Sequence, residues 1–232
     1  MIGLRAQIAS VITNVAGPYQ ETPSVARRRQ ASVIAGLVIG AVLLGVSLTR
    51  RPGDTSFYWL TFALAAVWAG AAYLSGPLHL GSICWRGRNK RPVLSGLTIG
   101  LLLGGLFVVG GLIIRRIDAL AEPITRVLQF ADQGSPLLVV VITLVNGVAE
   151  ELFFRGALYT VLQKWHPVLI STVLYVVATS ASGNPMLGFA AVILGTVCAL
   201  ERRATGGVLA PVLTHLVWGL IMVLALPPLF GL

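Results

Sequence analysis

The sequence predicts an all-α, polytopic membrane bundle of about seven transmembrane helices, with amphipathic helices at the membrane interface. Of the 232 residues, 56% are hydrophobic and only 11% are charged, whereas globular domains usually carry about 25% charged residues. The mean hydropathy of +0.87 is correspondingly high. Several apolar runs are long enough to cross a bilayer, which excludes a soluble protein built around a large core.

Residues 1–30 are predicted to form an amphipathic amino-terminal segment. Apolar side chains fall on one helical face opposite polar ones, which is typical of a helix lying in the membrane interface. A partly ordered tail is the alternative. No continuous apolar stretch lies between Arg5 and the triple arginine at 27–29, so the segment is not expected to be a signal peptide. The apolar face consists of Leu4, Ile8, Val11, Ile12 and Val15.

Residues 31–232 are predicted to form one domain, the transmembrane bundle. The fifth and sixth of its seven apolar runs are shorter than the roughly 20 residues usually needed to span, so we expect thinning of the bilayer or shielding by neighbouring helices. A charged and apolar stretch over 115–133 predicts a second interfacial helix, interrupted near Pro123. The seven runs are 31–49, 57–76, 93–114, 137–162, 167–182, 187–200 and 208–226.

The distribution of Lys and Arg predicts a cytoplasmic amino terminus. Eleven basic residues would lie inside and five outside, in line with the positive-inside rule. Because the net charge of +9 comes from short clusters between apolar runs, we expect contacts with membrane lipid and other membrane proteins, and none with nucleic acid. The inside set is Arg5, Arg27, Arg28, Arg29, Arg86, Arg88, Lys90, Arg91, Lys164, Arg202 and Arg203, and the outside set is Arg50, Arg51, Arg115, Arg116 and Arg126.

Glu150, Glu151 and Arg155 are three charged residues within one apolar run. An ionised side chain at bilayer depth costs on the order of 2.5 to 3.5 kcal/mol on insertion scales, so each should face a partner or a polar cavity. Glu151 and Arg155 are four apart and share a helical face, while Glu150 points about 100° away. Asn146, one turn earlier, lies near that direction and is expected to hydrogen-bond Glu150. A general base is the functional interpretation, and a polar cluster that fixes helix packing is the structural one.

His215 lies inside the last apolar run and is the remaining intramembrane candidate. It could join the glutamate site or simply donate a hydrogen bond between helices. His79 and His166 fall near the ends of runs and are expected to be interfacial. No histidine pair has metal-ligand spacing and the two cysteines are isolated, so we expect no metal and no cofactor.

The run Glu150-Glu151-Leu152-Phe153-Phe154-Arg155 resembles the first motif, E-E-x-x-x-R, of the CPBP family of intramembrane proteases. This family includes type II CAAX prenyl endopeptidases and bacteriocin-processing proteins. The resemblance covers a CPBP-like core over 137–226 and implies an integral protein of a bacterial inner (plasma) membrane. It also implies catalytic positions at Glu150, Glu151, Arg155 and His215, with a glutamate that activates water. The similarity continues through Phe189, Gly195, Arg202, Arg203, Thr205, Gly206, Ala210 and Pro211.

Two positions depart from the family pattern. The second motif, F-x-x-x-H, aligns with 175–179 and places Thr179 where a histidine is expected. The last motif, H-x-x-x-N, aligns with 215–219 and places Gly219 where an asparagine would stabilise the oxyanion. Threonine cannot act as a base near neutral pH, and loss of one oxyanion donor typically lowers the rate about 100- to 1000-fold.

Two principal hypotheses follow for the function. The first is a CPBP-like pseudoenzyme that serves as an accessory subunit of a membrane complex, such as a lipid or solute transport system. The alternative is an active intramembrane glutamate-dependent endopeptidase that cleaves CAAX-type or leader peptides, with a peptide as partner only in that case. A proton or ion transporter is a third and weaker possibility, because the sequence lacks an internal repeat.

Overall fold

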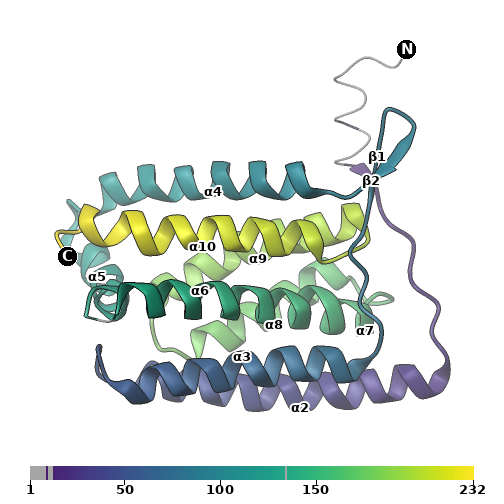
Figure 1. Cartoon of the computed structure of the whole chain (residues 1–232), viewed down its shortest axis with the longest axis horizontal. Helices are drawn as coiled ribbons and strands as arrows, with labels where there is room; N and C mark the ends of the chain where they lie inside the picture. The colour runs from purple at the N-terminus through teal and green to yellow at the C-terminus, as the bar shows by residue number, and fades with distance from the viewer. Residues whose placement is uncertain (1–8, 10–12, 134) are drawn as a thin grey trace.

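The computed structural model describes residues 9, 13–133 and 135–232. Over these residues the chain is a bundle of long helices that run roughly along one axis (Figure 1). The all-α membrane bundle predicted from the sequence is confirmed. The long helices are α2 (Pro23–Ser47), α3 (Thr55–Ser75), α4 (Val93–Ile114), α6 (Pro136–Glu151), α8 (Pro167–Ser180), α9 (Pro185–Thr205) and α10 (Leu209–Leu229).

Six helical stretches of the described chain are long and apolar enough to cross a membrane, which makes this an integral membrane protein. One of them, Pro136–Val161, is a composite that begins with α6. The predicted fifth span corresponds to α8, whose 14 residues are short for a crossing. The predicted sixth span is too short, because α9 continues to Thr205. Its last turn holds charged residues that make hydrogen bonds inside the protein, so hydropathy alone ended the helix too early.

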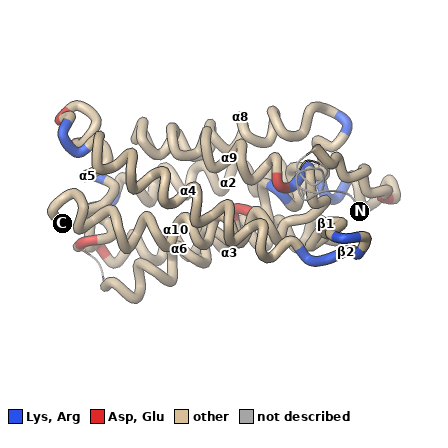
Figure 2. Tube along the Cα trace, turned by 90° about the horizontal axis from the view of Figure 1, so that it is seen from above, with Lys and Arg blue, Asp and Glu red and all other residues tan. Residues whose placement is uncertain are grey.

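The two ends of the bundle differ in structure. A short antiparallel hairpin, β1 (Ile83–Trp85) and β2 (Arg88–Lys90), lies at one end together with the start of α2 and the turn between α9 and α10. The opposite end carries α5 (Asp118–Asp132) and the carboxyl terminus (Figure 1). Figure 2 shows blue segments at both ends and long uncharged stretches between them. The sequence did not reveal the hairpin.

Helix α5 corrects one prediction. The sequence suggested an interruption near Pro123, yet the helix runs unbroken through this residue. Pro123 lies in the second turn, so its missing N–H removes only one hydrogen bond of the ladder. Its own carbonyl accepts a hydrogen bond of 2.8 Å from the side-chain amide of Asn184, which ties α5 to the start of α9.

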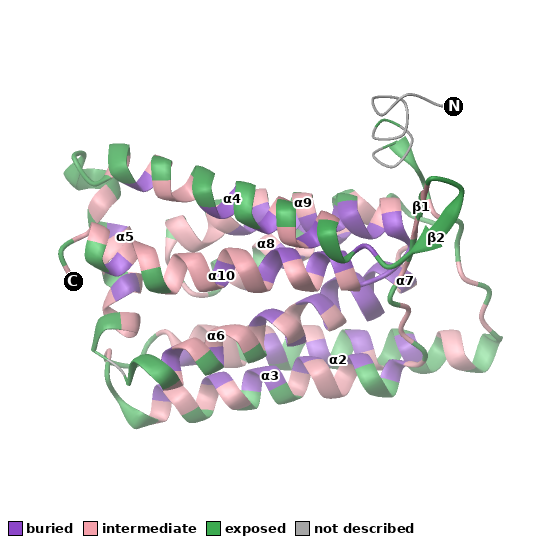
Figure 3. Ribbon diagram, turned by 45° about the horizontal axis from the view of Figure 1, so that its top comes forward, coloured by how far each residue is buried: buried purple, intermediate pink, exposed green. Residues whose placement is uncertain are grey.

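Aromatic side chains fill the centre of the bundle. Trp68 of α3 is 1% exposed, and Phe153 and Phe154 are completely buried. The Trp68 ring lies 5.3 Å from that of Phe154 in an edge-to-face arrangement, which is favourable for aromatic pairs. Gly40 of α2 lies directly against the indole of Trp68, where a Cβ atom would collide with the ring. Figure 3 shows buried residues on the inward faces of the helices and exposed residues on the outward faces of α2 and α4.

The amino-terminal prediction is only partly accessible. Leu4, Ile8, Val11 and Ile12 lie outside the described residues, so the amphipathic helix stays a prediction. The described residues 14–20 are not helical. They run along the end of α9, where the amide of Ala16 donates to the carbonyl of Arg203 at 2.9 Å.

Candidate functional site

The candidate site begins where α6 changes its winding. Directly after Glu151 the chain forms a π-helical segment, η1 (Leu152–Leu158), before a last short turn, α7 (Tyr159–Val161). The regular α-helix expected from the sequence is therefore wrong here. π-helical turns are rare and are often found at functional sites. Arg202 of α9 donates through Nε to the carbonyl of Arg155 at 2.7 Å, which links the π-helical segment to α9.

Glu151 is the most deeply buried acidic group of the site. Its side chain is 0% exposed, and its Oε1 atom accepts a hydrogen bond from Arg155 Nη1 at 3.0 Å. The same oxygen is joined by a 2.9 Å hydrogen bond to Nδ1 of His215, which comes from α10. The spacing of Glu151 and Arg155 thus predicted a contact that the structure contains. A single carboxylate oxygen, Oε1, therefore contacts both Arg155 and His215.

Arg155 is held from three directions. Besides Glu151, its guanidinium donates through Nη2 to the carbonyl of Gly195 at 3.0 Å. The guanidinium carbon lies 4.6 Å from the ring centre of Tyr175, within the range of a cation–π contact. A Cβ atom at Gly195 would lie 2.9 Å from the Tyr175 ring and 3.3 Å from Arg155 Nη2. Glycine at this position therefore allows α9 to approach both side chains.

Glu150 faces α8 and lies near His215. Its Oε2 atom accepts a hydrogen bond of 2.7 Å from the hydroxyl of Tyr175. The same atom lies 4.0 Å from Nε2 of His215, and the Glu150 side chain keeps 17% exposure. The hydrogen bond expected from Asn146 is a wrong prediction. The amide of Asn146 donates to the carbonyl of Ile142 at 2.9 Å, within its own helix.

His215 lies between the two glutamates and is 8% exposed. Gly147 makes room for it, since a Cβ atom there would be 3.3 Å from the imidazole. The Trp218 ring lies 5.8 Å away in an edge-to-face arrangement. Four elements therefore converge on one polar cluster: α6, η1, α8 and α10. The sequence singled out Glu150, Glu151, Arg155 and His215, and the structure brings all four together.

The two substituted positions have different surroundings. Thr179 lies on α8 one turn after Tyr175, is partly exposed, and makes no side-chain hydrogen bond within the described part of the chain. Gly219 is buried on α10 one turn after His215. A Cβ atom at Gly219 would lie 3.2 Å from a methyl group of Thr143, so the structure leaves little room for a larger side chain.

Two features of the site escaped the sequence-based prediction. Tyr175 stands at the aromatic position of the second motif, and its hydroxyl was a visible but unused signal. The second feature is another buried carboxylic acid: Glu201 is 7% exposed and accepts a 2.9 Å hydrogen bond from Thr214. Thr214 also lies 3.0 Å from the carbonyl of Gly96 on α4. Glu201 was missed because the predicted span ended one residue before it.

No group of three His, Cys, Asp or Glu side chains that could hold a metal ion occurs within residues 13–133 and 135–232. The donors present in the site are two carboxylates and one imidazole, and one carboxylate is already paired with Arg155. What the arrangement offers chemically is a partly exposed carboxylate beside an imidazole.

Fold and site together define a helical membrane protein with a buried glutamate–arginine–histidine cluster. Comparison with known families gives the class a more specific description. Residues 132–221 match the model of the family described as "Type II CAAX prenyl endopeptidase Rce1-like". This segment contains the whole cluster, and it confirms the resemblance to the CPBP family. The chain is thus an integral membrane protein whose residues 132–221 are similar to the CAAX-protease-like family. No curated protein and no solved structure matches the chain.

Proposed function

We propose that this chain is a non-catalytic member of the CAAX-protease-like group and serves as an accessory subunit of a membrane complex, such as a lipid or solute transport system. The observation that carries the proposal is the engagement of the charged groups by the protein itself. Glu151 is shared between Arg155 and His215, and Glu150 accepts the Tyr175 hydroxyl. These contacts describe a structural brace between helices.

The two substituted positions support the same conclusion. Water activation next to a glutamate benefits from a second base, and Thr179 offers only a hydroxyl. Stabilisation of an oxyanion needs a donor aimed at the developing charge. Gly219 has no side-chain donor, and Thr143 packs against the space beside it. Loss of one such donor alone lowers a rate about 100- to 1000-fold.

An active endopeptidase is the second candidate, and one observation favours it. Glu150 is the partly exposed carboxylate, and its Oε2 lies 4.0 Å from His215 Nε2, a separation that a water molecule could bridge. In that mechanism Glu150 would activate water and His215 would transfer a proton or bind the oxyanion. Glu151 and Arg155 would hold the imidazole in place.

A cleavage assay separates the two candidates. The purified full chain is reconstituted in liposomes and incubated with farnesylated CAAX peptides and with leader-containing peptides, beside the Glu150→Gln variant. We expect no product above the level of the variant. Cleavage by the unmodified chain that Glu150→Gln abolishes would refute the non-catalytic proposal and establish the endopeptidase.

The accessory role has its own test. The tagged chain is produced at its native level, extracted in mild detergent and analysed by size and by mass spectrometry. We expect a complex with a membrane partner in a fixed stoichiometric ratio that survives a second purification step. Recovery of the chain as a monomer, with no effect of its deletion on membrane transport, would contradict this role.

A further inference from the structure

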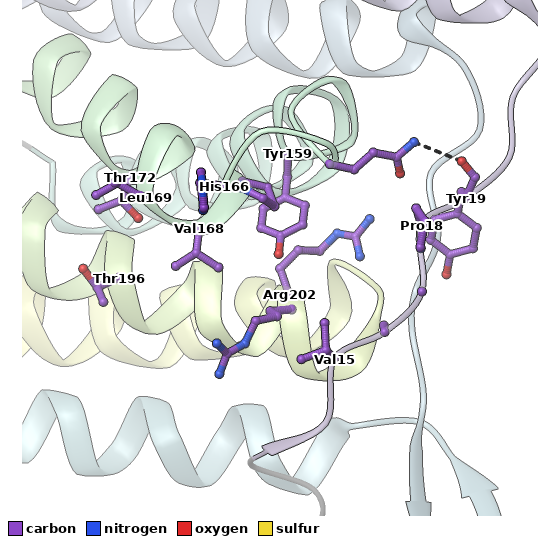
Figure 4. A pocket seen from close by; sticks show the side chains of 15 residues that line it. Val15, Pro18, Tyr19, Tyr159, His166, Val168, Leu169, Thr172, Thr196 and Arg202 are labelled. Atoms are coloured by element: carbon purple, nitrogen blue, oxygen red, sulfur yellow. Dashed lines mark hydrogen bonds between the residues drawn. The ribbon is translucent and has the colours of Figure 1, made fainter.

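A cavity of about 520 Å³ lies apart from the glutamate cluster, at the hairpin end of the bundle. The extended segment 15–19, the start of α8, the end of α9 and Tyr159 of α7 form its wall (Figure 4). Neither glutamate of the cluster lines it. Much of the wall is apolar, including Val168 and Leu169, yet Arg202 and Arg203 also face the cavity.

Arg202 is a buried cation without an acidic partner. It is 6% exposed, and of its nitrogens only Nε makes a hydrogen bond within the described chain, to the carbonyl of Arg155. Its guanidinium carbon lies 5.0 Å from the Tyr159 ring and 5.8 Å from the Tyr19 ring (Figure 4). No described carboxylate lies within 4.0 Å of Arg202, and the residues outside the description contain no Asp or Glu. A buried charge without a counter-charge is costly, so this site favours an anion.

The start of α8 is the second, independent feature that favours an anion. His166, the residue before the helix, has a left-handed backbone with φ 52° and provides no capping hydrogen bond. Within the described chain, the amides of Val168 and Leu169 have no acceptor. The unpaired N–H groups and the dipole of a helix start attract phosphates and carboxylates. Both residues line the same cavity as Arg202.

Arg203 adds a further positive charge. Its side chain lines the cavity, and its Nε is buried without a partner in the described residues. The cavity therefore combines two guanidinium groups with one uncapped helix start. Leu169 also lines the cavity and is 65% exposed, so an acyl chain would lie against it.

We propose that this cavity binds the phosphate of an anionic phospholipid, with the headgroup between Arg202, Arg203 and the start of α8. The acyl chains extend outward past Leu169 into the bilayer. The cavity is at the hairpin end of the bundle, and basic pockets between transmembrane helices are known to accept lipid phosphates. Free inorganic phosphate shares the anionic chemistry but would gain nothing from the apolar wall.

The test uses two variants, each with a matched control. Leu169→Glu places a carboxylate in the wall of the cavity, and Leu169→Gln is its uncharged control. A negative side chain in the first turn of a helix is favourable for the helix itself, so the variant should remain folded. Arg203→Gln removes one guanidinium, and Arg51→Gln removes one exposed arginine at the opposite end of the bundle as its control.

The purified full chain in detergent is titrated with phosphatidylglycerol, phosphatidylcholine and inorganic phosphate, and bound lipid is counted by native mass spectrometry. We expect retention of phosphatidylglycerol, little phosphatidylcholine, and about tenfold weaker binding in Leu169→Glu and Arg203→Gln than in their controls, as for loss of one charge-assisted contact. Equal retention of both lipids, or unchanged binding in both variants, would overturn the proposal. If inorganic phosphate alone binds as tightly as phosphatidylglycerol, the ligand is not a lipid and this part of the proposal is wrong.

Discussion

Replacement of Glu151 by glutamine should destabilise the fold far more than the same change at Glu150. Both changes are isosteric and remove one negative charge. At position 151, however, the lost charge is the partner of the fully buried guanidinium of Arg155, and Nη1 of this group is 3.0 Å away. The same oxygen also holds His215 at 2.9 Å. At position 150 the side chain is 17% exposed and lies 4.0 Å from Nε2 of His215, and the change weakens its charge-assisted contact with the Tyr175 hydroxyl.

The expected magnitudes follow from these contacts. Removal of one partner of a buried ion pair typically costs about 3 to 5 kcal/mol, because the other charge is left uncompensated. Glutamine keeps a carbonyl oxygen that can accept one hydrogen bond, so we expect about 3 kcal/mol for Glu151→Gln. For Glu150→Gln we expect about 1 kcal/mol, because the carbonyl oxygen of glutamine can still accept from Tyr175 and the hydrogen bond loses only its charge assistance. The double variant Glu151→Gln/Arg155→Met removes both charges and should recover much of the loss.

The assay is unfolding of the purified protein in mixed micelles by a denaturing detergent, followed by tryptophan fluorescence. Each variant is compared with the unmodified chain at one pH and one lipid content. The interpretation of the cluster as a structural brace fails if Glu151→Gln is no more destabilising than Glu150→Gln. It also fails if the double variant is less stable than Glu151→Gln alone.

Three further predictions address packing, orientation and pH. Gly195→Ala should destabilise the fold by about 1 to 3 kcal/mol, as overpacking does, because the new Cβ would lie 2.9 Å from a tyrosine ring. The control is Gly105→Ala, whose Cβ would meet nothing within 4 Å. Equal melting temperatures of the two variants would contradict the packing argument. A membrane-impermeant maleimide should not label the exposed Cys84 of the hairpin in intact cells, but should label Asp132→Cys in a cysteine-free background; the reverse pattern would place the amino terminus outside. Desolvation, helped by two nearby arginines, lowers the pKa of His79 from 6.5, so the folded state binds fewer protons than the unfolded one. Stability should therefore fall as pH drops below 6.5 and level off below the folded pKa, and a His79→Gln variant with the same pH profile would refute this.

The sequence was informative about local and compositional features. Helical spacing places Glu151 beside Arg155, and hydropathy places the helices that cross the membrane. The partners that complete the site are different, because they depend on how helices pack against one another. The contact between Glu151 and His215 joins residues 64 positions apart, and the carbonyl of Gly195 that receives Arg155 is on another helix. The π-helical segment after Glu151 follows from the same packing.

Polar residues within the apolar helices were the main source of error. The charged turn at Glu201 and Arg202 reduced the local hydropathy, although both side chains are buried and hydrogen-bonded inside the protein. Asn146 was expected to reach Glu150, but a carbonyl of its own helix was available as an acceptor. In both cases the hydrogen-bond partner decided the outcome, and no pattern of residue types specifies that partner.

The proposed non-catalytic role requires a reason, other than activity, for the chain to keep a protease-like motif. Glu151, Arg155 and His215 form one hydrogen-bonded unit across α6, η1 and α10, and loss of any one leaves a buried polar group without its partner. Stability alone is therefore sufficient reason to keep these residues. Thr179 and Gly219 are outside that unit, so replacement of the family's histidine and asparagine at these positions does not break the brace. The two departures from the family pattern, Thr179 and Gly219, lie outside this hydrogen-bonded unit, which is the distribution that the proposed non-catalytic role predicts.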